Sequence, residues 1–194
     1  MKQDIILAGV GGQGILSIAT VIGSAALEQG LCIKQAEVHG MSQRGGDVQS
    51  HLRLSTAPIH SDLIPQGGAD LIVSLEPMEA LRYLPYLSPE GWIVTNSVPF
   101  QNIPNYPEVE KVLDTLRKLP RVIIINADAT AKEVNSARSA NMVLLGATSS
   151  VMGLLDPDKL RDGIRRIFAR KGDAIVDANL KAFDAGLRLC RQTE

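Results

Sequence analysis

The sequence predicts an α/β fold, a three-layer Rossmann-like domain in which helices cover both faces of a largely parallel sheet. Two features of the pattern favour this class: apolar runs of strand length alternate with segments of helical periodicity, and a glycine turn joins the first run to the first helix. Aromatic residues make up only 4% of a chain that is 45% hydrophobic, which suits buried parallel strands. With 194 residues, the chain can bury a substantial core as one domain.

The first part of the chain predicts a strand, a helix and two further strands. Residues 5–8 form an apolar run, and residues 14–29 then repeat apolar side chains at steps of three and four, which indicates a helix that stops at Gly30. The next strand is expected at 32–38. From 47 to 55 apolar and polar residues alternate, the pattern of a strand with one solvated face, and we expect this strand to be antiparallel to its neighbours.

The middle of the chain continues the alternation. Pro77 marks the start of a helix, because proline is favoured at the first helical position. The segment 97–107 carries three prolines and little periodicity, so it is interpreted as a surface excursion. Asp128 is expected to cap a short helix after the last strand. The strands of this part are predicted at 70–75, 92–96 and 120–127, the last with its apolar run at 122–125.

From residue 138 onward the pattern is helical to the end of the chain, with a cap and a proline start at Asp156-Pro157. Glycines and alanines around Gly146 predict close helix packing in this region. Basic residues concentrate here, but acidic residues alternate with them at helical pairing distances, which predicts a solvated, ion-paired helix face. These residues are Arg161, Arg165, Arg166, Arg170 and Lys171 with Asp158, Asp162 and Asp173.

Composition narrows the classes of function and location. The net charge of −1 gives no reason to expect nucleic acid as a partner. No apolar run is long enough for a membrane span or a signal peptide, so we expect a cytoplasmic protein that does not engage a membrane. Cys32 and Cys190 have no ligand-spaced neighbours and are expected to be buried thiols in a reducing compartment. We expect no metal site in this chain.

A glycine turn is the first candidate site. Glycines at positions 9, 11 and 14 satisfy the G-x-G-x-x-G pattern between a strand and a helix, where backbone N–H groups and the helix dipole favour an anion. Glu37 lies where a dinucleotide fold places its ribose-binding carboxylate, so a nicotinamide cofactor is one alternative. A tight structural junction with no ligand is another. The candidate binding residues are Gly11, Gly12, Gln13 and Gly14.

A second candidate segment follows at residues 40–46. A guanidinium on a loop, with two open glycines after it, suits bidentate recognition of a phosphate or carboxylate. The alternative is a flexible hairpin in which the arginine simply covers the surface. The candidate binding residues are Ser42, Gln43, Arg44, Gly45 and Gly46.

These motifs carry a resemblance to the beta subunits of indolepyruvate ferredoxin oxidoreductases and, more broadly, to the gamma domain of pyruvate and 2-oxoacid ferredoxin oxidoreductases. The likeness covers nearly the whole chain, so it implies that residues 1–194 form a single gamma-type domain. It is carried by the segments 9–14, 37–46, 51–54, 69–70, 76–84, 128–129 and 141–146.

The resemblance implies the small subunit of an enzyme that converts an arylpyruvate to an aryl-acetyl-coenzyme A, carbon dioxide and reduced ferredoxin. Family members use thiamine diphosphate with Mg²⁺ and iron–sulfur clusters. Two isolated cysteines cannot hold a four-iron cluster, and no Gly-Asp-Gly segment for a magnesium diphosphate site is present. These groups are therefore expected on a large alpha subunit, with ferredoxin binding to the complex and no catalytic residue on this chain. Coenzyme A is expected at or near the two glycine segments.

Two other functions are weighed against this one. The chain could be a free-standing NAD- or NADP-binding protein, which the glycine turn and Glu37 favour. Alternatively, it could be a non-catalytic scaffold whose glycines only make tight turns. The oxidoreductase subunit is the preferred hypothesis, and it predicts an exposed apolar patch for the partner, either around the segment 97–107 or on the last two helices.

Overall fold

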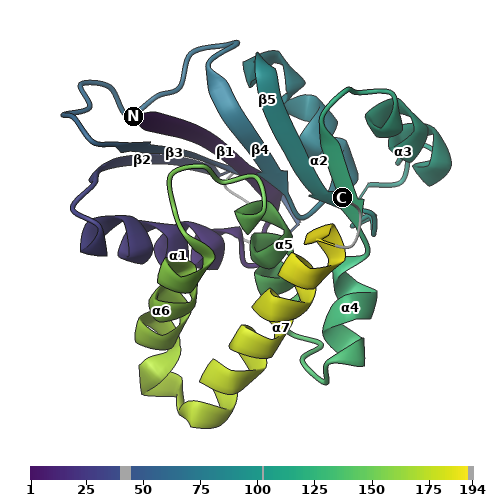
Figure 1. Ribbon diagram of the computed structural model, residues 1–194. Helices are drawn as coiled ribbons and strands as arrows, with labels where there is room; N and C mark the ends of the chain where they lie inside the picture. Colours follow the sequence, from purple (N-terminus) through teal and green to yellow (C-terminus); the bar gives the residue numbers. More distant parts are fainter. Residues whose placement is uncertain (40–44, 102, 192–194) are drawn as a thin grey trace.

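The fold is built on one six-stranded sheet with the strand order β2-β3-β1-β4-β5-β6 (Figure 1). The computed structural model describes residues 1–39, 45–101 and 103–191. The strands are β1 (Lys2–Val10), β2 (Cys32–His39), β3 (Asp47–Ser55), β4 (Ala69–Ser74), β5 (Leu87–Asn96) and β6 (Val122–Ile125). The helices are α1 (Ile15–Glu28), α2 (Pro77–Arg82), α3 (Val109–Arg117), α4 (Ala127–Glu133), α5 (Ala140–Ser149), α6 (Pro157–Phe168) and α7 (Asp173–Arg191), with short 3₁₀ turns η1 (Leu84–Tyr86) and η2 (Ala169–Lys171).

The sheet is parallel except for β3. Ile5 of β1 pairs with Leu71 of β4 in a parallel register and with Leu52 of β3 in an antiparallel one. β3 is also antiparallel to β2, so β2 runs in the same direction as β1. The carboxyl ends of β1, β2, β4, β5 and β6 therefore lie along one edge of the sheet, which we call the carboxyl edge. The expected largely parallel sheet with an antiparallel strand at 47–55 is confirmed.

Helices cover both faces of the sheet, as expected. Ile5 and Leu7 of β1 point into a core with α1, α4, α5, α6 and α7, whereas Ile6 and Ala8 point into a second core with α2 and α3. This alternation is the period of two of a β-strand. Figure 1 shows the larger helical layer below the sheet and the smaller one above it.

The expected solvated face of β3 differs in the structure. His51 is only 3% exposed and Ser55 only 9%, because the connection from β3 to β4 folds over the polar face of the strand. The Ile64 N–H donates to Nδ1 of His51 at 3.0 Å, and Arg53 donates to the carbonyl oxygen of Leu63 at 3.0 Å. Polar alternation in this strand therefore reflects hydrogen bonding to a covering loop rather than contact with water.

Two other local expectations are corrected. The cap of α4 is Asn126, whose Oδ1 accepts from the Ala129 N–H at 2.9 Å, while Asp128 lies inside the first turn. Asn can reach the orphan N–H groups only from the position before the helix, and residue 126 holds that position. Cys32 is exposed and Cys190 is partly exposed, so neither is the expected buried thiol. Cys32 begins the edge strand β2, which has a neighbour on one side only.

The close packing expected near Gly146 is confirmed between α5 and α7. A Cβ atom on Gly146 would lie 1.9 Å from the Phe183 carbonyl oxygen, and one on Gly186 would lie 1.9 Å from the Val143 carbonyl oxygen. Because these two contacts pair earlier residues of α5 with later residues of α7, the helices are antiparallel. The last turn of α7 therefore lies beside the first turn of α5.

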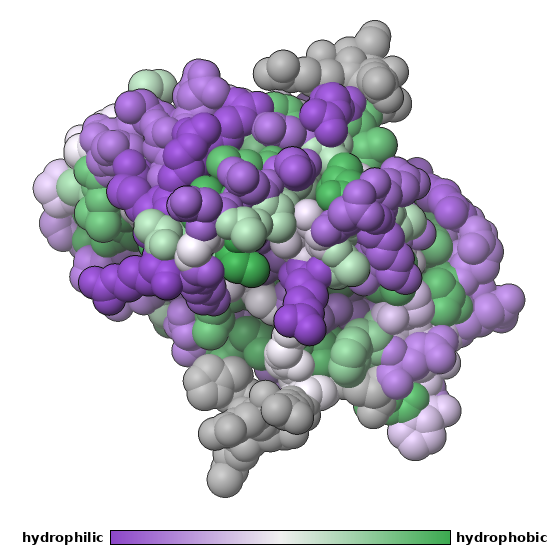
Figure 2. All heavy atoms as spheres, turned by 90° about the horizontal axis from the view of Figure 1, so that it is seen from below, coloured by the Kyte–Doolittle hydropathy of each residue, from purple (hydrophilic) through white to green (hydrophobic). Residues whose placement is uncertain are grey.

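The ion-paired face predicted at the C-terminal helices is confirmed for Asp158 and Asp162, which pair with Arg161 and Arg165. Arg161 pairs with Asp184 at 2.8 Å, Arg165 with Asp162 at 2.7 Å, and Arg166 reaches across to α1. Figure 2 views the molecule from the side of these helices, and hydrophilic residues predominate there. None of the helices in the described part of the chain is long and apolar enough to cross a membrane.

Candidate functional site at the carboxyl edge

The glycine turn joins β1 to α1 at the carboxyl edge. Gly12 and Gly14 have φ angles of +103° and +86°, a region that side chains other than glycine rarely adopt. A Cβ atom on Gly14 would also lie 2.6 Å from Nδ2 of Asn141, whereas one on Gly12 would meet nothing within 4 Å. Among the residues that the structure describes, no side chain caps the N-terminus of α1, and its first turn contains no acidic residue. The turn thus leaves the positive end of the α1 dipole open to a ligand.

The structure brings the two candidate segments together. The Gly11 N–H donates to the Gly46 carbonyl oxygen at 2.8 Å, and the Gly45 N–H donates back to the Gly11 carbonyl oxygen at 3.5 Å. Two glycine segments separated in sequence therefore share a pair of backbone hydrogen bonds. Ser42, Gln43 and Arg44, the other candidates of the second segment, lie outside the described residues.

Gln13 holds the turn in place. Its Oε1 accepts from the Val10 N–H at 2.7 Å, and its Nε2 donates to the Leu75 carbonyl oxygen at 3.1 Å. Both ends of the side-chain amide are thus engaged by the backbone, one on β1 and one just after β4. We assign Gln13 to shaping the turn rather than to direct contact with a ligand.

A hollow of about 280 Å³ opens at this turn. Its walls combine glycine backbone with apolar side chains and contain no charged side chain among the described residues. An anion could approach the exposed N–H groups at one end of such a hollow while an apolar group rests on the other. The lining residues are Val10, Gly11, Gly12, Gly14, Ile15, Leu16 and Val48.

An acidic cluster lies beside the turn at the start of α2. Glu76 is 1% exposed, and its carboxylate accepts from the Glu79 N–H at 2.9 Å and from the Tyr106 hydroxyl. Burial raises the pKa of Glu79, despite its ion pair with Arg82, and burial together with the Glu76 carboxylate raises the pKa of the Tyr106 phenol. Nothing in the sequence pattern indicates the contact between Tyr106 and Glu76, because it joins a loop to a helix cap.

The acidic cluster lies at the topological switch point of the sheet, where the helices that follow two neighbouring strands cover opposite faces. The helix that follows β1 covers one face and the helix that follows β4 covers the other, and open α/β sheets usually bind ligands in the crevice between two such strands. Here Gln13 bridges that crevice, and buried carboxylates line its far side. Among the described residues, the side of the turn that stays open is the hollow lined by α1 and β3 residues.

The topology argues against the nicotinamide alternative. In dinucleotide folds the ribose-binding carboxylate ends the strand next to β1. In this sheet β3 lies between β1 and β2, which carries Glu37. Glu37 is exposed, and its Oε1 accepts from Nε2 of Gln35 at 2.6 Å. The residue is therefore separated from the glycine turn by a whole strand.

The asparagines at the carboxyl edge have structural partners. Asn96 donates to the Asp128 carboxylate at 2.8 Å and accepts from the Ala127 N–H at 3.0 Å, which ties β5 to α4. Asn141 donates to the Gly14 carbonyl oxygen at 3.2 Å. This last contact places the first turn of α5 directly against the glycine turn.

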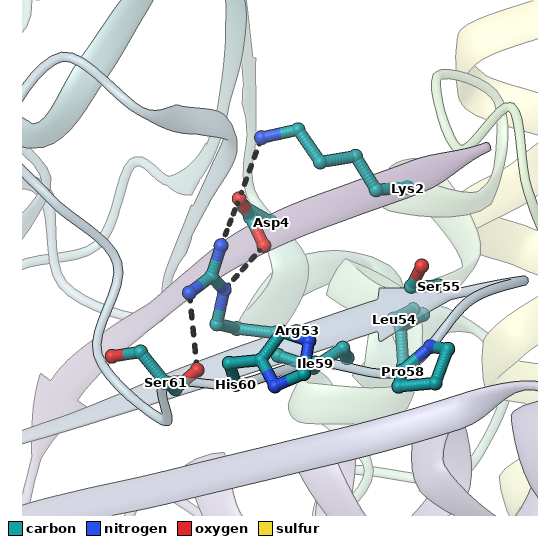
Figure 3. Close-up of a pocket in the computed structure, with 9 residues that line it drawn as sticks. All are labelled: Lys2, Asp4, Arg53, Leu54, Ser55, Pro58, Ile59, His60 and Ser61. Atoms are coloured by element: carbon teal, nitrogen blue, oxygen red, sulfur yellow. Dashed lines mark hydrogen bonds and ion pairs between the residues drawn. The ribbon is translucent and has the colours of Figure 1, made fainter.

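A second hollow, of about 310 Å³, lies at the opposite edge of the sheet (Figure 3). Its charged groups satisfy one another: Asp4 accepts from Arg53 at 2.8 Å and from Lys2 at 3.0 Å, and Arg53 also donates to the Ser61 carbonyl oxygen at 3.0 Å. Burial alone would raise the pKa of Asp4, but Arg53 and Lys2 outweigh it and lower the pKa. Because these charges are already paired with one another, we interpret this cluster as structural: it fixes the loop after β3 to the sheet.

The described residues include no group of three or more His, Cys, Asp or Glu side chains placed to hold a metal ion. The groups that the site brings together are an uncapped helix start, an adjoining apolar hollow, and a second glycine segment hydrogen-bonded to the first.

Comparison with known proteins identifies related chains. Residues 4–189 match the model of the pyruvate ferredoxin/flavodoxin oxidoreductase family. The chain is 37% identical to the indolepyruvate oxidoreductase subunit IorB of Archaeoglobus fulgidus, over 96% of this chain and 94% of the relative. It is 35% identical to the subunit of the same name from Pyrococcus horikoshii, over 99% and 98% of the two chains.

A solved structure shares the fold. It is the 2-oxoglutarate:ferredoxin oxidoreductase of Magnetococcus marinus, with 2-oxoglutarate, coenzyme A and succinyl-CoA bound. The match has a TM-score of 0.77 and 25% identity, and it covers 98% of this chain. The chain corresponds to only 31% of the length of that longer polypeptide.

Proposed function

Because the chain belongs to the pyruvate ferredoxin/flavodoxin oxidoreductase family, we propose that it is the small subunit of an oxidoreductase acting on indolepyruvate or a related arylpyruvate. In the proposed reaction the oxoacid loses carbon dioxide, the remaining acyl group is joined to the sulfur of coenzyme A, and two electrons pass to ferredoxin. Support comes from relatives named indolepyruvate oxidoreductase subunits that match over 94% and 98% of their own length.

The proposal assigns cleavage and electron transfer to a larger partner subunit. That subunit is proposed to hold thiamine diphosphate with Mg²⁺, which stabilises the carbanion left by decarboxylation, and the iron–sulfur clusters. The two cysteines of this chain are too few for a four-iron cluster. Ferredoxin accepts electrons from the complex, and this chain contributes binding residues but no reacting group.

The role proposed for this chain is to hold coenzyme A, whose pyrophosphate and 3′-phosphate are anions. The observation that carries this role is the backbone pairing of Gly11 with Gly46 beside the uncapped start of α1. It places the donors of the glycine turn next to the segment that ends at Gly46. The Gly11 and Gln13 N–H groups already donate to the Gly46 and Val10 carbonyl oxygens, so the phosphate accepts from the other N–H groups at the start of α1 and gains the favourable end of the helix dipole.

The surrounding charges support one orientation of the ligand. Buried Glu76 excludes the phosphates from the crevice between β1 and β4, so they lie on the side of the turn that faces β3. The apolar wall formed by Leu16 and Val48 then supports an uncharged part of the molecule. Arg44, in the segment that precedes Gly45, is proposed to supply the cation that pairs with a phosphate.

Two variants of equal shape test this role. Gly12 has a strained φ but open space around it, so Gly12→Asp and Gly12→Asn carry the same conformational cost and differ in charge. In the reconstituted enzyme we expect Gly12→Asp to raise the KM for coenzyme A about tenfold over Gly12→Asn, a difference of about 1.4 kcal/mol. The KM for the oxoacid should be the same in both. Equal KM values for coenzyme A would favour the scaffold hypothesis.

Replacement of Arg44 tests the second segment. We expect Arg44→Ala to raise the KM for coenzyme A while leaving the KM for the oxoacid within twofold, because loss of a charge-assisted hydrogen bond costs roughly 1.5–3 kcal/mol. Steady-state kinetics with each substrate varied in turn measure both constants. Unchanged kinetics for coenzyme A would remove Arg44 from the site.

A further inference from the structure

We propose that the carboxyl edge of the sheet is the surface that docks on the large subunit, the polypeptide that holds the oxoacid-cleaving centre. This inference rests on the proposed function and adds the location of the interface. Exposed apolar side chains, the position of the glycine turn and the length of a related chain support it independently.

Exposed apolar side chains gather at this edge. Leu16 begins α1, Val38 lies near the end of β2, and Phe100 and Ile103 follow β5, with 42%, 50%, 43% and 39% of their surfaces exposed. Leu189, 38% exposed, lies in the last turn of α7, which packs beside the first turn of α5 and so reaches the glycine turn. Five of the nine large hydrophobic residues exposed in the described chain thus lie at one edge.

The other faces offer less for a partner. The outer face of α6 carries arginines already paired with carboxylates at Asp158, Asp162 and Asp184, and hydrophilic residues predominate over the face in Figure 2. Of the other four exposed residues, Met1 and Leu63 lie at the opposite edge of the sheet, and Leu27 and Ile175 lie at distant helix ends. The centre of a stable protein–protein interface contains few charged residues and many apolar ones.

The chemistry of coenzyme A requires the centre of the large subunit to lie close to the glycine turn. The pantetheine arm extends from the pyrophosphate to the reacting sulfur by on the order of 15–20 Å, since its bonds are near 1.5 Å. If the phosphates bind at Gly11 to Gly14, the sulfur must meet the acyl group within that reach. A partner bound to the ion-paired outer face of α6 would leave the whole helical layer between its centre and the turn.

The related longer chain points to the same kind of partner. In the 2-oxoglutarate:ferredoxin oxidoreductase, the region that matches this chain makes up 31% of one polypeptide. The corresponding region there is covalently joined to the other 69% of its chain. Because the matching region is part of a longer polypeptide in that enzyme, we infer that it also associates with a large subunit here, and exposed apolar groups supply the attraction.

Charge substitutions at exposed positions test the location. Phe100→Asp and Val38→Asp place a charge on the proposed surface, and Leu27→Asp and Ile175→Asp place the same charge elsewhere. All four side chains are at least 43% exposed, so the fold should tolerate each change, which circular dichroism and urea midpoints check. The measured quantity is the dissociation constant between each variant and the large subunit purified from the native complex.

We expect Phe100→Asp and Val38→Asp to raise this dissociation constant at least tenfold, and the two control variants to change it less than twofold. The reverse ranking, or equal values for all four variants, would overturn the proposed surface. The effect of Gly12→Asp on the KM for coenzyme A separates the docking proposal from the proposal that this chain binds coenzyme A. Suppose that Gly12→Asp raises the KM for coenzyme A but that Phe100→Asp and Val38→Asp leave the dissociation constant unchanged. The proposed docking surface is then wrong, and coenzyme A binding stands. The opposite pair of results refutes coenzyme A binding and leaves the docking surface supported.

Discussion

The contact between α5 and α7 makes a quantitative prediction for Gly146→Ala. The new Cβ atom would lie 1.9 Å from the Phe183 carbonyl oxygen, whereas ordinary contacts of this kind begin at 3.4 Å. The clashing atom belongs to the backbone of α7 and cannot rotate away, so the two helices must separate by roughly the missing distance. We expect the upper end of the usual cost of overpacking, about 3 kcal/mol.

The gain in helix propensity opposes this cost and amounts to about 1 kcal/mol for glycine to alanine. The net destabilisation is therefore about 2 kcal/mol. Gly23→Ala is the matched control, because Gly23 lies inside α1 and a Cβ atom there meets nothing within 4 Å. This control should increase the free energy of unfolding by about 0.5–1 kcal/mol.

Urea denaturation followed by circular dichroism measures both free energies of unfolding. Gly146→Ala should lower the denaturation midpoint, and Gly23→Ala should raise it, with the slope unchanged in each. If Gly146→Ala were as stable as Gly23→Ala, the close approach of α5 and α7 would be refuted, since helix propensity alone would then explain both variants.

Three further predictions follow from hydrogen bonds and pKa shifts. Gln13→Glu removes the donor to the Leu75 carbonyl oxygen and should lower the free energy of unfolding by about 1–3 kcal/mol, measured by urea denaturation; an unchanged midpoint would contradict the bridge. Asp4→Asn should destabilise the protein by about 1.5–3 kcal/mol at neutral pH. Because the folded pKa of Asp4 is lowered, its stabilisation is complete above the ordinary value of 3.8 and is lost as the pH falls through the lowered pKa, so the gap between wild type and variant should close in acid. Burial raises the pKa of Tyr83 from 10 to about 12, so stability should fall between pH 10 and 12 as the unfolded phenol ionises first, by about 2 kcal/mol. In Tyr83→Phe this alkaline loss should be smaller; a melting curve with the same pH dependence as the wild type would show that another group titrates.

Local patterns predict most of the secondary structure. The first strand and α1 follow from an apolar run and a helical period, and α6 follows from Asp156, whose carboxylate accepts from the Asp158 N–H at 2.8 Å. Helix α3 was not predicted, because only Val112, Leu113 and Leu116 are buried in a short, charged segment that follows prolines. Such a helix is stabilised mainly by packing its apolar side chains against the sheet, and this tertiary contact leaves no local pattern in the sequence.

The order of strands could not be predicted from local patterns. Alternation identifies β3 as a strand, but its insertion between β1 and β2 depends on pairings between distant residues. The same limit affects the site. Glycine spacing predicts the turn at Gly11 to Gly14, whereas its hydrogen bond to Gly46 and the role of Gln13 depend on where separate segments meet. The candidates Ser42, Gln43 and Arg44 remain predictions.

The place of β1 in the sheet has a consequence for biosynthesis. Ile5 pairs with Leu52 on one side and with Leu71 on the other, so this largely buried strand has no neighbour until residues 47–55 have been translated. Until then the nascent chain presents residues 2–10 as an unpaired, largely apolar segment, at risk of association with other chains. Folding of this chain should therefore be slow for its size, since its central pairings are all non-local, and its yield should depend on chaperones that shield the first ten residues during synthesis.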